Sequence, residues 1–213
     1  MLLLFVPLVN GQQNDAGFWA SVTIKKQVTR KFGVNISEQI RLYQNVSEIE
    51  QIFTDLGAEY AFTSSFKAAF NYRMTKKNEQ TYYSTRHRFY LDVSYRYKAK
   101  PFVFTVRERI QRQVEEVNSS ETGKIPVWYL RSKLAVKLDL DKKYSPYVSA
   151  EFAYLIDNVD ETDQVFDKAR YEVGVDYEFD KRSSLNLFYL IQSDLIENKT
   201  RDFVSGVGYT YSF

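Results

Sequence analysis

Cysteine is absent from this chain of 213 residues, and histidine occurs once, at His87. Without cysteine the protein has no disulfide bonds and no thiolate chemistry, and a single histidine supplies too few ligands for a zinc or other transition-metal site. The formal net charge is only +2, so no overall basic field exists to attract nucleic acid. A glycine-rich phosphate loop and a nucleophile elbow are also missing. We therefore expect no cofactor, no metal and no nucleic-acid partner.

Long hydrophobic runs are missing as well. Beyond residue 9 no apolar run approaches the roughly 20 residues that a membrane-spanning helix needs, and the mean hydropathy is −0.42. Residues 1–9 are apolar and precede small and polar residues, which is typical of the core and cleavage site of a secretory signal. We assign residues 1–12 to a signal peptide whose basic start is missing, and residues 13–213 to one exported domain. The alternative for the first segment is an apolar strand.

Aromatic residues are abundant, with 17 Tyr and 16 Phe, and they follow a two-residue period. The last segment has an apolar face and a small, polar face: Val207, Tyr209, Tyr211 and Phe213 against Gly206, Gly208, Thr210 and Ser212. Strict alternation that ends on a C-terminal aromatic residue is typical of outer-membrane β-barrels. We interpret Tyr209, Tyr211 and Phe213 as the signal for the barrel-assembly machinery. We expect an integral protein of the cell outer membrane, in contact with its lipids and lipopolysaccharide.

Alternating segments continue along the chain and predict an all-β fold, an antiparallel up-and-down transmembrane β-barrel. The predicted strands are 19–28, 34–43, 51–62, 66–76, 83–97, 101–113, 127–140, 146–156, 167–179, 184–193 and 203–213. Eleven segments conflict with the even strand number of single-chain bacterial barrels. We therefore expect about twelve strands, with a further short strand near residues 12–18, and ten strands as the alternative.

The connections between these segments alternate in length. Short ones are predicted at 29–33, 64–65, 98–100, 141–145 and 180–183, and long ones at 44–50, 77–82, 115–126, 157–166 and 193–202. Membrane barrels have short periplasmic turns and long extracellular loops, so this order supports a membrane barrel.

Each strand has one apolar and one polar face. In the segment 83–97 these are His87, Phe89, Leu91, Val93, Tyr95 and Tyr97 against Arg86, Arg88, Tyr90, Asp92, Ser94 and Arg96. Alternation alone does not tell which face is inside, because a soluble β-sandwich has the same pattern with its apolar face buried. The strand length, the terminal Phe213 and a girdle of aromatic residues near strand ends favour the membrane barrel. The residues assigned to this girdle are Tyr43, Tyr72, Trp128, Tyr147, Tyr177 and Phe179.

Two carboxylates, Glu38 and Glu108, fall on the apolar face. An unpaired charge there would be costly at the middle of a bilayer. We expect Glu38 to pair with Lys26 across the first hairpin, or a bulge to turn either glutamate inward. Glu108 has no evident partner.

The concentrated chemistry of the chain lies on the polar faces, which form the lumen of the predicted barrel. The basic lumen residues are Arg73, Arg86, Arg88, Arg96, Arg107, Arg109, Arg131, Lys133, Lys137 and Arg170. The acidic ones are Asp55, Glu59, Asp92, Glu151, Glu172, Asp176 and Glu178. Basic residues dominate the middle strands and acidic ones the flanking strands. The charges either pair and fill a narrow interior, or they line a narrow aqueous path that favours small anions or zwitterionic solutes.

Four segments resemble one family of Gram-negative outer-membrane proteins: Thr85–Asp92, Pro146–Glu151, Tyr171–Tyr177 and Gly206–Tyr211. This family is catalogued as domain of unknown function twenty-four-ninety, and the resemblance extends from Trp19 to Phe213. It implies an outer-membrane β-barrel. It implies no established activity and no functional residues.

The leading hypothesis for function is a small passive channel or transporter with a charged lumen. The second is a sealed structural, adhesion or assembly barrel that acts through its polar loops. The third is an outer-membrane lipid-modifying enzyme that uses His87, although alternation places His87 on the lipid side and we expect no enzyme. Acidic residues at Asp157, Asp160, Glu161 and Asp163 form a candidate for weakly bound calcium, with a solvated loop as the favoured interpretation. The sequence does not indicate the oligomeric state.

Overall fold

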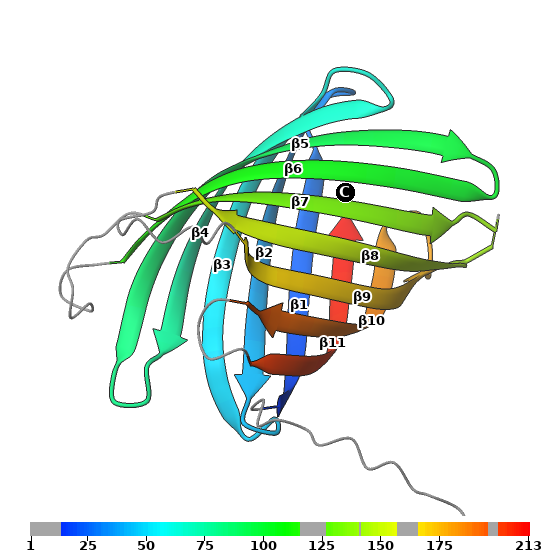
Figure 1. Cartoon of the computed structure of the whole chain (residues 1–213). Coiled ribbons are helices and arrows are strands. Elements are labelled where there is room, and N and C mark those ends of the chain that lie inside the picture. Colours follow the sequence, from blue (N-terminus) through cyan, green and yellow to red (C-terminus); the bar gives the residue numbers. More distant parts are fainter. Residues whose placement is uncertain (1–13, 116–126, 141, 157–165, 196–199) are drawn as a thin grey trace, which may run out of the picture.

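The computed structural model describes residues 14–115, 127–140, 142–156, 166–195 and 200–213, which form a closed β-barrel of eleven strands (Figure 1). The strands are β1 (Asn14–Gln27), β2 (Phe32–Tyr43), β3 (Glu48–Ala61), β4 (Phe66–Asn78), β5 (Tyr83–Ala99), β6 (Phe102–Glu115), β7 (Val127–Leu138), β8 (Tyr144–Leu155), β9 (Phe166–Glu178), β10 (Ser183–Asp194) and β11 (Arg201–Ser212). The predicted signal peptide, residues 1–12, lies outside the described residues. No helix in the described part of the chain is long and apolar enough to cross a membrane.

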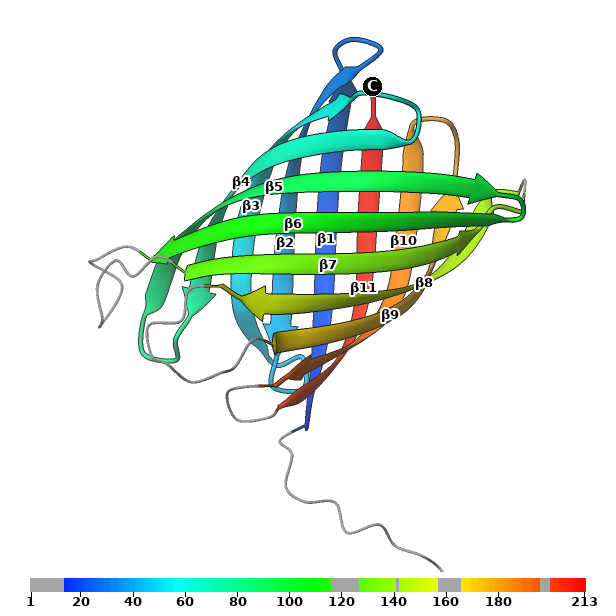
Figure 2. The ribbon, with the colours of Figure 1, turned by 45° about the horizontal axis from the view of Figure 1, so that its top comes forward.

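The predicted all-β fold is confirmed, and the eleven strands are close to the predicted number of about twelve, but the expectation of an even number is wrong. β1 runs without a break from Asn14 to Gln27, so residues 14–18 belong to β1 and form no strand of their own. The barrel closes through a parallel pair, in which Asn14 lies opposite Arg201 in β11 (Figure 2). The other neighbouring strands described here pair antiparallel, in chain order. One parallel pair lets an odd number of strands close without leaving a free edge.

The connections lie alternately at two ends of the barrel. We call the end with the β2–β3, β4–β5, β6–β7, β8–β9 and β10–β11 connections the loop end, and the opposite end the turn end. The predicted long loops at 44–50 and 77–82 are wrong, because the connections there span only residues 44–47 and 79–82. The polar residues that suggested loops continue the ladders instead, with Tyr43 opposite Glu48 and Asn78 opposite Tyr83.

The β2–β3 connection is tied to the start of β1. Gln44, Asn45 and Val46 have φ angles of 52°, 56° and 67°. The backbone N–H groups of Gln44 and Asn45 donate to the carboxylate of Asp15 at 2.8 and 2.9 Å. Successive N–H groups in this conformation form an anion-binding nest, which a side chain of the same protein occupies here. Asp15 is thereby held at the loop end.

Asp180 stabilises the β9–β10 connection at the turn end. Its carboxylate accepts hydrogen bonds from the backbone N–H groups of Arg182 (2.6 Å) and Ser183 (2.8 Å), and these bonds hold the pKa of Asp180 below its ordinary value. A carboxyl group with a lowered folded-state pKa stabilises the fold above the unfolded pKa, and this stabilisation is lost as the pH falls through the folded-state value. We expect Asp180→Asn to make the acid side of the stability profile less steep, measured by urea unfolding at several acidic pH values. An unchanged profile would contradict this role.

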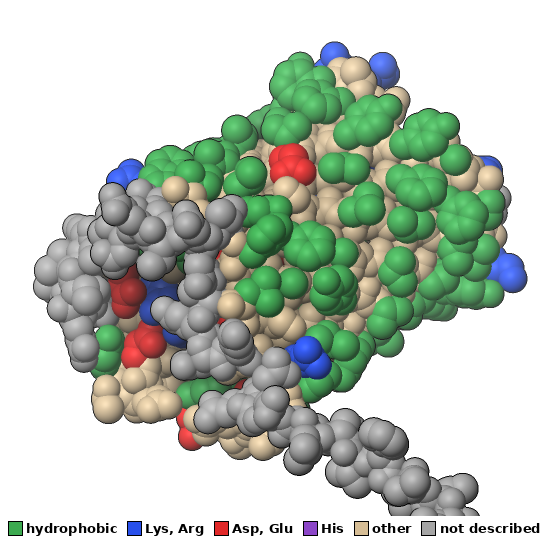
Figure 3. Space-filling model, in the orientation of Figure 1, with side chains coloured by type: hydrophobic (Ala, Val, Ile, Leu, Met, Phe, Trp, Pro, Cys, Tyr) green, Lys and Arg blue, Asp and Glu red, His purple; other side chains and the backbone are tan. Residues whose placement is uncertain are grey.

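The distribution of polar and apolar side chains in this barrel is the reverse of that in a soluble protein. Its outer face carries exposed apolar side chains, among them Phe70 (55%), Tyr95 (52%) and Val173 (53%). Figure 3 shows hydrophobic side chains spread over this face, with basic ones at its margins. The buried side chains include the polar Gln111 (4%) and Glu151 (7%). The polar faces of the alternating strands therefore point inward.

The predicted aromatic girdle is partly wrong. Trp128, Tyr177 and Phe179 are exposed at strand ends, as predicted. Tyr147 instead points inward, where its hydroxyl donates to Glu172 Oε1 at 2.7 Å, and Tyr43 lines an internal cavity. Tyr72, the remaining member, lies in the middle of β4. Tyr43 and Tyr147 both lie near a strand end, but the two-residue period of their strands directs their side chains inward.

Glu38 and Glu108 lie on the outer face, each bonded to a hydroxyl of the next strand. Thr54 Oγ1 donates to Glu38 Oε1, and Ser132 Oγ donates to Glu108 Oε2, both at 2.6 Å. Lys26 does not pair with Glu38, because the register places it opposite Val34 and its ammonium lies 5.1 Å from the Phe213 ring. The bulges in the described ladders occur elsewhere, at Arg41/Leu42 and Ala153/Tyr154. Figure 3 shows an acidic group enclosed by hydrophobic side chains on the outer face.

Glycines make room for large side chains inside the barrel. A Cβ atom at Gly206 would lie 2.0 Å from Cζ of Phe188 on the adjacent β10. The Phe188 ring in turn packs edge-on against Trp19, with 6.3 Å between the ring centroids. Together with Leu190 and Val204 they form a buried apolar cluster. One part of the interior is therefore filled by hydrophobic side chains.

Candidate functional site

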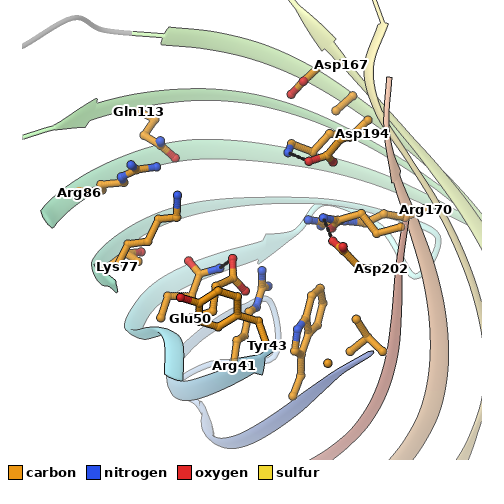
Figure 4. A pocket seen from close by; sticks show the side chains of 18 of the residues that line it. Arg41, Tyr43, Glu50, Lys77, Arg86, Gln113, Asp167, Arg170, Asp194 and Asp202 are labelled. Carbon is orange, nitrogen blue, oxygen red and sulfur yellow. Dashed lines mark hydrogen bonds and ion pairs between the residues drawn. The ribbon is translucent and has the colours of Figure 1, made fainter. Parts of the chain in front are cut away.

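A cavity of about 690 Å³ occupies the interior towards the loop end (Figure 4). All eleven strands contribute lining residues. The charged side chains that line it are Asp15, Arg41, Glu50, Arg73, Lys77, Glu79, Arg86, Arg88, Arg131, Glu151, Asp167, Lys168, Arg170, Asp194 and Asp202. The cavity is therefore a polar space in which basic and acidic groups are nearly balanced in number.

Arginine and aromatic side chains alternate around the barrel wall at the inner part of this cavity. The guanidinium carbon of Arg41 lies 3.7 Å from the ring centroid of Trp19 and 5.1 Å from that of Phe53. The guanidinium carbon of Arg73 lies 3.8 Å from the centroid of the same Phe53 ring, so this ring lies between two arginines. Stacking of this kind is favourable because the π face of an aromatic ring attracts a cation. It also fixes the planes of the guanidinium groups.

The same arrangement continues through the next strands. Arg109 lies 3.9 Å from the Tyr90 ring centroid and forms two hydrogen bonds with Asp92, at 2.6 and 2.8 Å. Tyr90 donates to Asp55 Oδ1 at 2.6 Å, and Asp55 also accepts from Arg73 Nε at 2.7 Å. Tyr90, Asp55 and Arg109 are all buried. The charges of Asp55, Arg73 and Arg109 are thus paired, which offsets the cost of their desolvation.

Glu151 on β8 holds the opposite wall together. Its carboxylate forms ion pairs with Arg107, Arg131 and Arg170, the last at 3.5 Å. Arg170 lies 5.7 Å from the Trp19 ring centroid, which brings the series back to β1. We call this set the arginine–aromatic belt: Trp19, Arg41, Phe53, Arg73, Tyr90, Arg109, Arg131, Glu151 and Arg170.

Further ion pairs lie on both sides of the belt. Towards the turn end, Lys133 pairs with Glu172 (3.8 Å) and Lys137 with Asp176 (2.7 Å). Towards the loop end, Arg86 pairs with Glu79, and Lys168 pairs with Asp194 at 3.0 Å. Most of the charges around the belt are therefore paired, and a cavity lies between the belt and the loop end.

Comparison with known proteins gives a family and a set of folds. The family model described as "Protein of unknown function (DUF2490)" matches residues 16–202. The chain belongs to this family. The resemblance found in the sequence is thus confirmed. A comparison with curated proteins finds no match.

Two solved structures share the fold of this DUF2490 protein. The first, described as a "NanC porin structure", has a TM-score of 0.55 and 8% sequence identity, over 89% of this chain and 92% of that chain. The second, LpxR from Salmonella typhimurium, has a TM-score of 0.52 and 7% identity, over 85% of this chain and 83% of that chain. Both are outer-membrane barrel proteins. At these identities the likeness concerns the fold alone.

The structure brings most of the predicted lumen residues into the network, and leaves others at the turn end. Glu59 pairs there with Lys67 at 3.1 Å. Arg96 and Glu178 are exposed, and neither forms an ion pair within the described residues. The acidic candidates for calcium, Asp157, Asp160, Glu161 and Asp163, lie outside the described residues. Among the described residues no group of three or more acidic or histidine side chains is placed to hold a metal.

Sequence reasoning missed two residues of the belt, Arg41 and Trp19. Arg41 shares a face with Asn35, Ser37 and Gln39, so the two-residue period contained the signal for its inward position. The same period groups Trp19 with Ser21 and Thr23, but a tryptophan near a strand end is expected at the membrane interface. Its inward position follows from the pairing of β1 with β2, which places it opposite Arg41.

His87 lies on the outer face, away from the cavity. A hydrogen bond of 2.7 Å joins its Nδ1 atom to Tyr72 Oη, and the two rings stack with 6.0 Å between their centroids. Its position on the outer side of β5 agrees with the alternation of that strand.

Proposed function

We propose that this protein spans the outer membrane and acts as a small passive channel for polar solutes. The observation that carries the proposal is the cavity of about 690 Å³, which is lined by charged and amide side chains and reaches from the loop end to the belt. A barrel that served only as a scaffold would fill this space with packed side chains. The belt is then the constriction of the channel.

The reversed polarity of the barrel supports the membrane location. Exposed apolar side chains cover the outer face, from Val22 and Ile36 to Leu187, and a patch of this extent is not tolerated on a monomer in water. Tyr211 and Phe213, part of the proposed assembly signal, lie on the same outer face at the turn end, with ring centroids 6.1 Å apart. We place the turn end in the periplasm and the loop end outside, with lipopolysaccharide around the latter.

Single-channel conductance of the refolded protein in a planar bilayer tests the channel. We expect discrete conductance steps. Lys133 and Lys137 are suited to probing the path, because they point inward and are only partly buried (27% and 35% exposed), so their loss is compatible with folding. The variant Lys133→Gln/Lys137→Gln should shift the ion selectivity towards cations. Lys26→Gln, on the outer face, is the matched control and should leave the selectivity unchanged.

A sealed barrel is the second candidate, and the ion pairs around Glu151 favour it. Three arginines converge on this one carboxylate, which narrows the lumen at the belt. A folded protein that produces no conductance steps would reject the channel and support a barrel that acts through its loops. We propose no catalytic role for His87, since its ring is bonded to Tyr72 on the lipid side.

A further inference from the structure

Two arginines of the cavity, Arg41 and Arg88, form no ion pair with a carboxylate in the part of the chain that the structure describes. The other six basic residues that line the cavity each do: Arg73 with Asp55, Lys77 and Arg86 with Glu79, Arg131 and Arg170 with Glu151, and Lys168 with Asp194. Arg41 and Arg88 are therefore the exceptions in a network that is otherwise neutralised.

The side chain of Arg41 is held by an aromatic ring, and one of its N–H donors has no acceptor among the described residues. Its guanidinium stacks on Trp19 at 3.7 Å, and its buried Nε atom has no hydrogen-bond acceptor among the described residues. Glu50 lies on the same wall of the cavity (Figure 4), where it accepts from Gln51 at 3.1 Å and forms no ion pair with Arg41. The stacking leaves the N–H groups of Arg41 pointing along the plane of the guanidinium, away from the ring faces.

Among the described residues, Arg88 has only a neutral partner. Its Nε and Nη2 atoms both donate to Oε1 of Gln113, with Nε at 3.1 Å. Its direct cross-strand neighbour in β4 is Arg73, and like charges in that position destabilise a sheet. Asp55 neutralises Arg73, whereas nothing in the described structure neutralises Arg88. A partly buried cation without a carboxylate partner is a favourable site for an anion.

Two further carboxylates of the cavity are engaged towards the loop end. Both oxygens of Asp15 accept from the β2–β3 connection, and Asp202 accepts from Gln192 at 3.0 Å. The cavity thus has an uncompensated basic surface at its inner part and acidic groups near its mouth. Its volume lies within the 300–1,000 Å³ range of small-molecule sites.

We propose that Arg41 and Arg88 bind the oxyanion group of a small organic solute, a carboxylate or a phosphate, while the rest of the solute occupies the cavity above them. Guanidinium groups suit both anions, because their planar donors match two oxygens at once. This inference names the solute class of the proposed channel and in that respect rests on it.

Tryptophan fluorescence tests the site directly, because the protein has two tryptophans and one of them, Trp19, stacks on Arg41. Trp128 lies on the outer face, so the variant Trp128→Phe leaves Trp19 as the reporter. Citrate and inorganic phosphate serve as the two probes, and glycerol as the neutral one, at constant ionic strength. We expect a saturable change in Trp19 emission with citrate, phosphate or both, and none with glycerol. The effective probe identifies the oxyanion.

Substitution in the Trp128→Phe background assigns the response to the proposed residues. Arg88→Gln should weaken the apparent affinity about tenfold or more, the value of one charge-assisted contact. Arg96→Gln, an exposed arginine of the same strand, is the matched control and should leave it unchanged. Each variant is folded if its unheated sample migrates on a gel at the same position as the unheated wild-type barrel.

The outcomes separate this inference from the channel. No saturable response to either anion, or an equal response in Arg88→Gln, would overturn the site even if the protein conducts. Saturable binding by a protein that produces no conductance steps would reject the channel and retain the anion site.

Discussion

Replacing Glu151 with glutamine is expected to lower the free energy of unfolding by about 3–5 kcal/mol, the cost of removing one partner from a buried ion pair. Glu151 is 7% exposed and is shared by Arg107, Arg131 and Arg170. Without its charge, three guanidinium groups remain in a confined space with no carboxylate between them. Glutamine has nearly the same shape, so the change removes charge rather than packing. Urea unfolding in lipid vesicles, followed by tryptophan fluorescence, measures the effect.

Glu178→Gln provides the matched control, because Glu178 belongs to the inward series of β9 but is exposed at the turn end. We expect its effect to stay within about 0.5 kcal/mol. A loss below about 1 kcal/mol for Glu151→Gln would show that other groups neutralise the three arginines. The belt would then be better hydrated than its burial indicates.

Adding a single methyl group at Gly206 should also destabilise the barrel, by about 1–3 kcal/mol, the usual cost of overpacking. The new Cβ atom would lie 2.0 Å from Cζ of Phe188, so the ring would have to leave its place. Phe188 packs on Trp19 in the buried apolar cluster, and its displacement would therefore disturb the belt as well. The same unfolding measurement detects the loss for Gly206→Ala.

Gly33→Ala is the comparison, because a Cβ atom at Gly33 would meet its nearest neighbours at 3.4 Å, an ordinary contact. It should change stability by less than about 1 kcal/mol. In the double variant Gly206→Ala/Phe188→Leu, the smaller side chain should recover part of the loss, so that the two effects are not additive. Additive effects would show that Phe188 is not the obstacle.

The two-residue period predicted most of the fold, because the barrel is one sheet whose strands all separate an apolar outer face from a polar interior face. It separated Phe89 and Leu91 from Arg88 and Tyr90, whereas the strand length, the terminal Phe213 and the aromatic residues near strand ends were needed to assign the apolar face to the outside. It could not supply the strand number, because the pairing of β1 with β11 depends on contacts between the two ends of the chain. The general preference for even numbers then led away from the eleven segments that the sequence contains.

The candidate site was less accessible to sequence reasoning. Alternation assigns Glu151, Arg131 and Arg170 to one interior, but it does not reveal that the three side chains meet. Their convergence follows from the register, which places Glu151 opposite Arg170 on one side and Lys133 on the other. Arg88 has no carboxylate partner among the described residues, and this too is a property of the assembled sheet, since the neutral Gln113 that it contacts is 25 positions away in the chain.

The parallel closure of β1 on β11 separates the two ends of the described chain by the full height of the wall. Asn14 lies beside Arg201, whereas Lys25 lies beside Ser212, so the chain does not return to its starting point. A linker that joined Phe213 to Asn14 would have to follow the 14 residues of β1, a path of roughly 43 Å at about 3.3 Å per residue. Circular permutation by a short linker, which suits barrels closed by an antiparallel pair, is therefore geometrically impossible for this one.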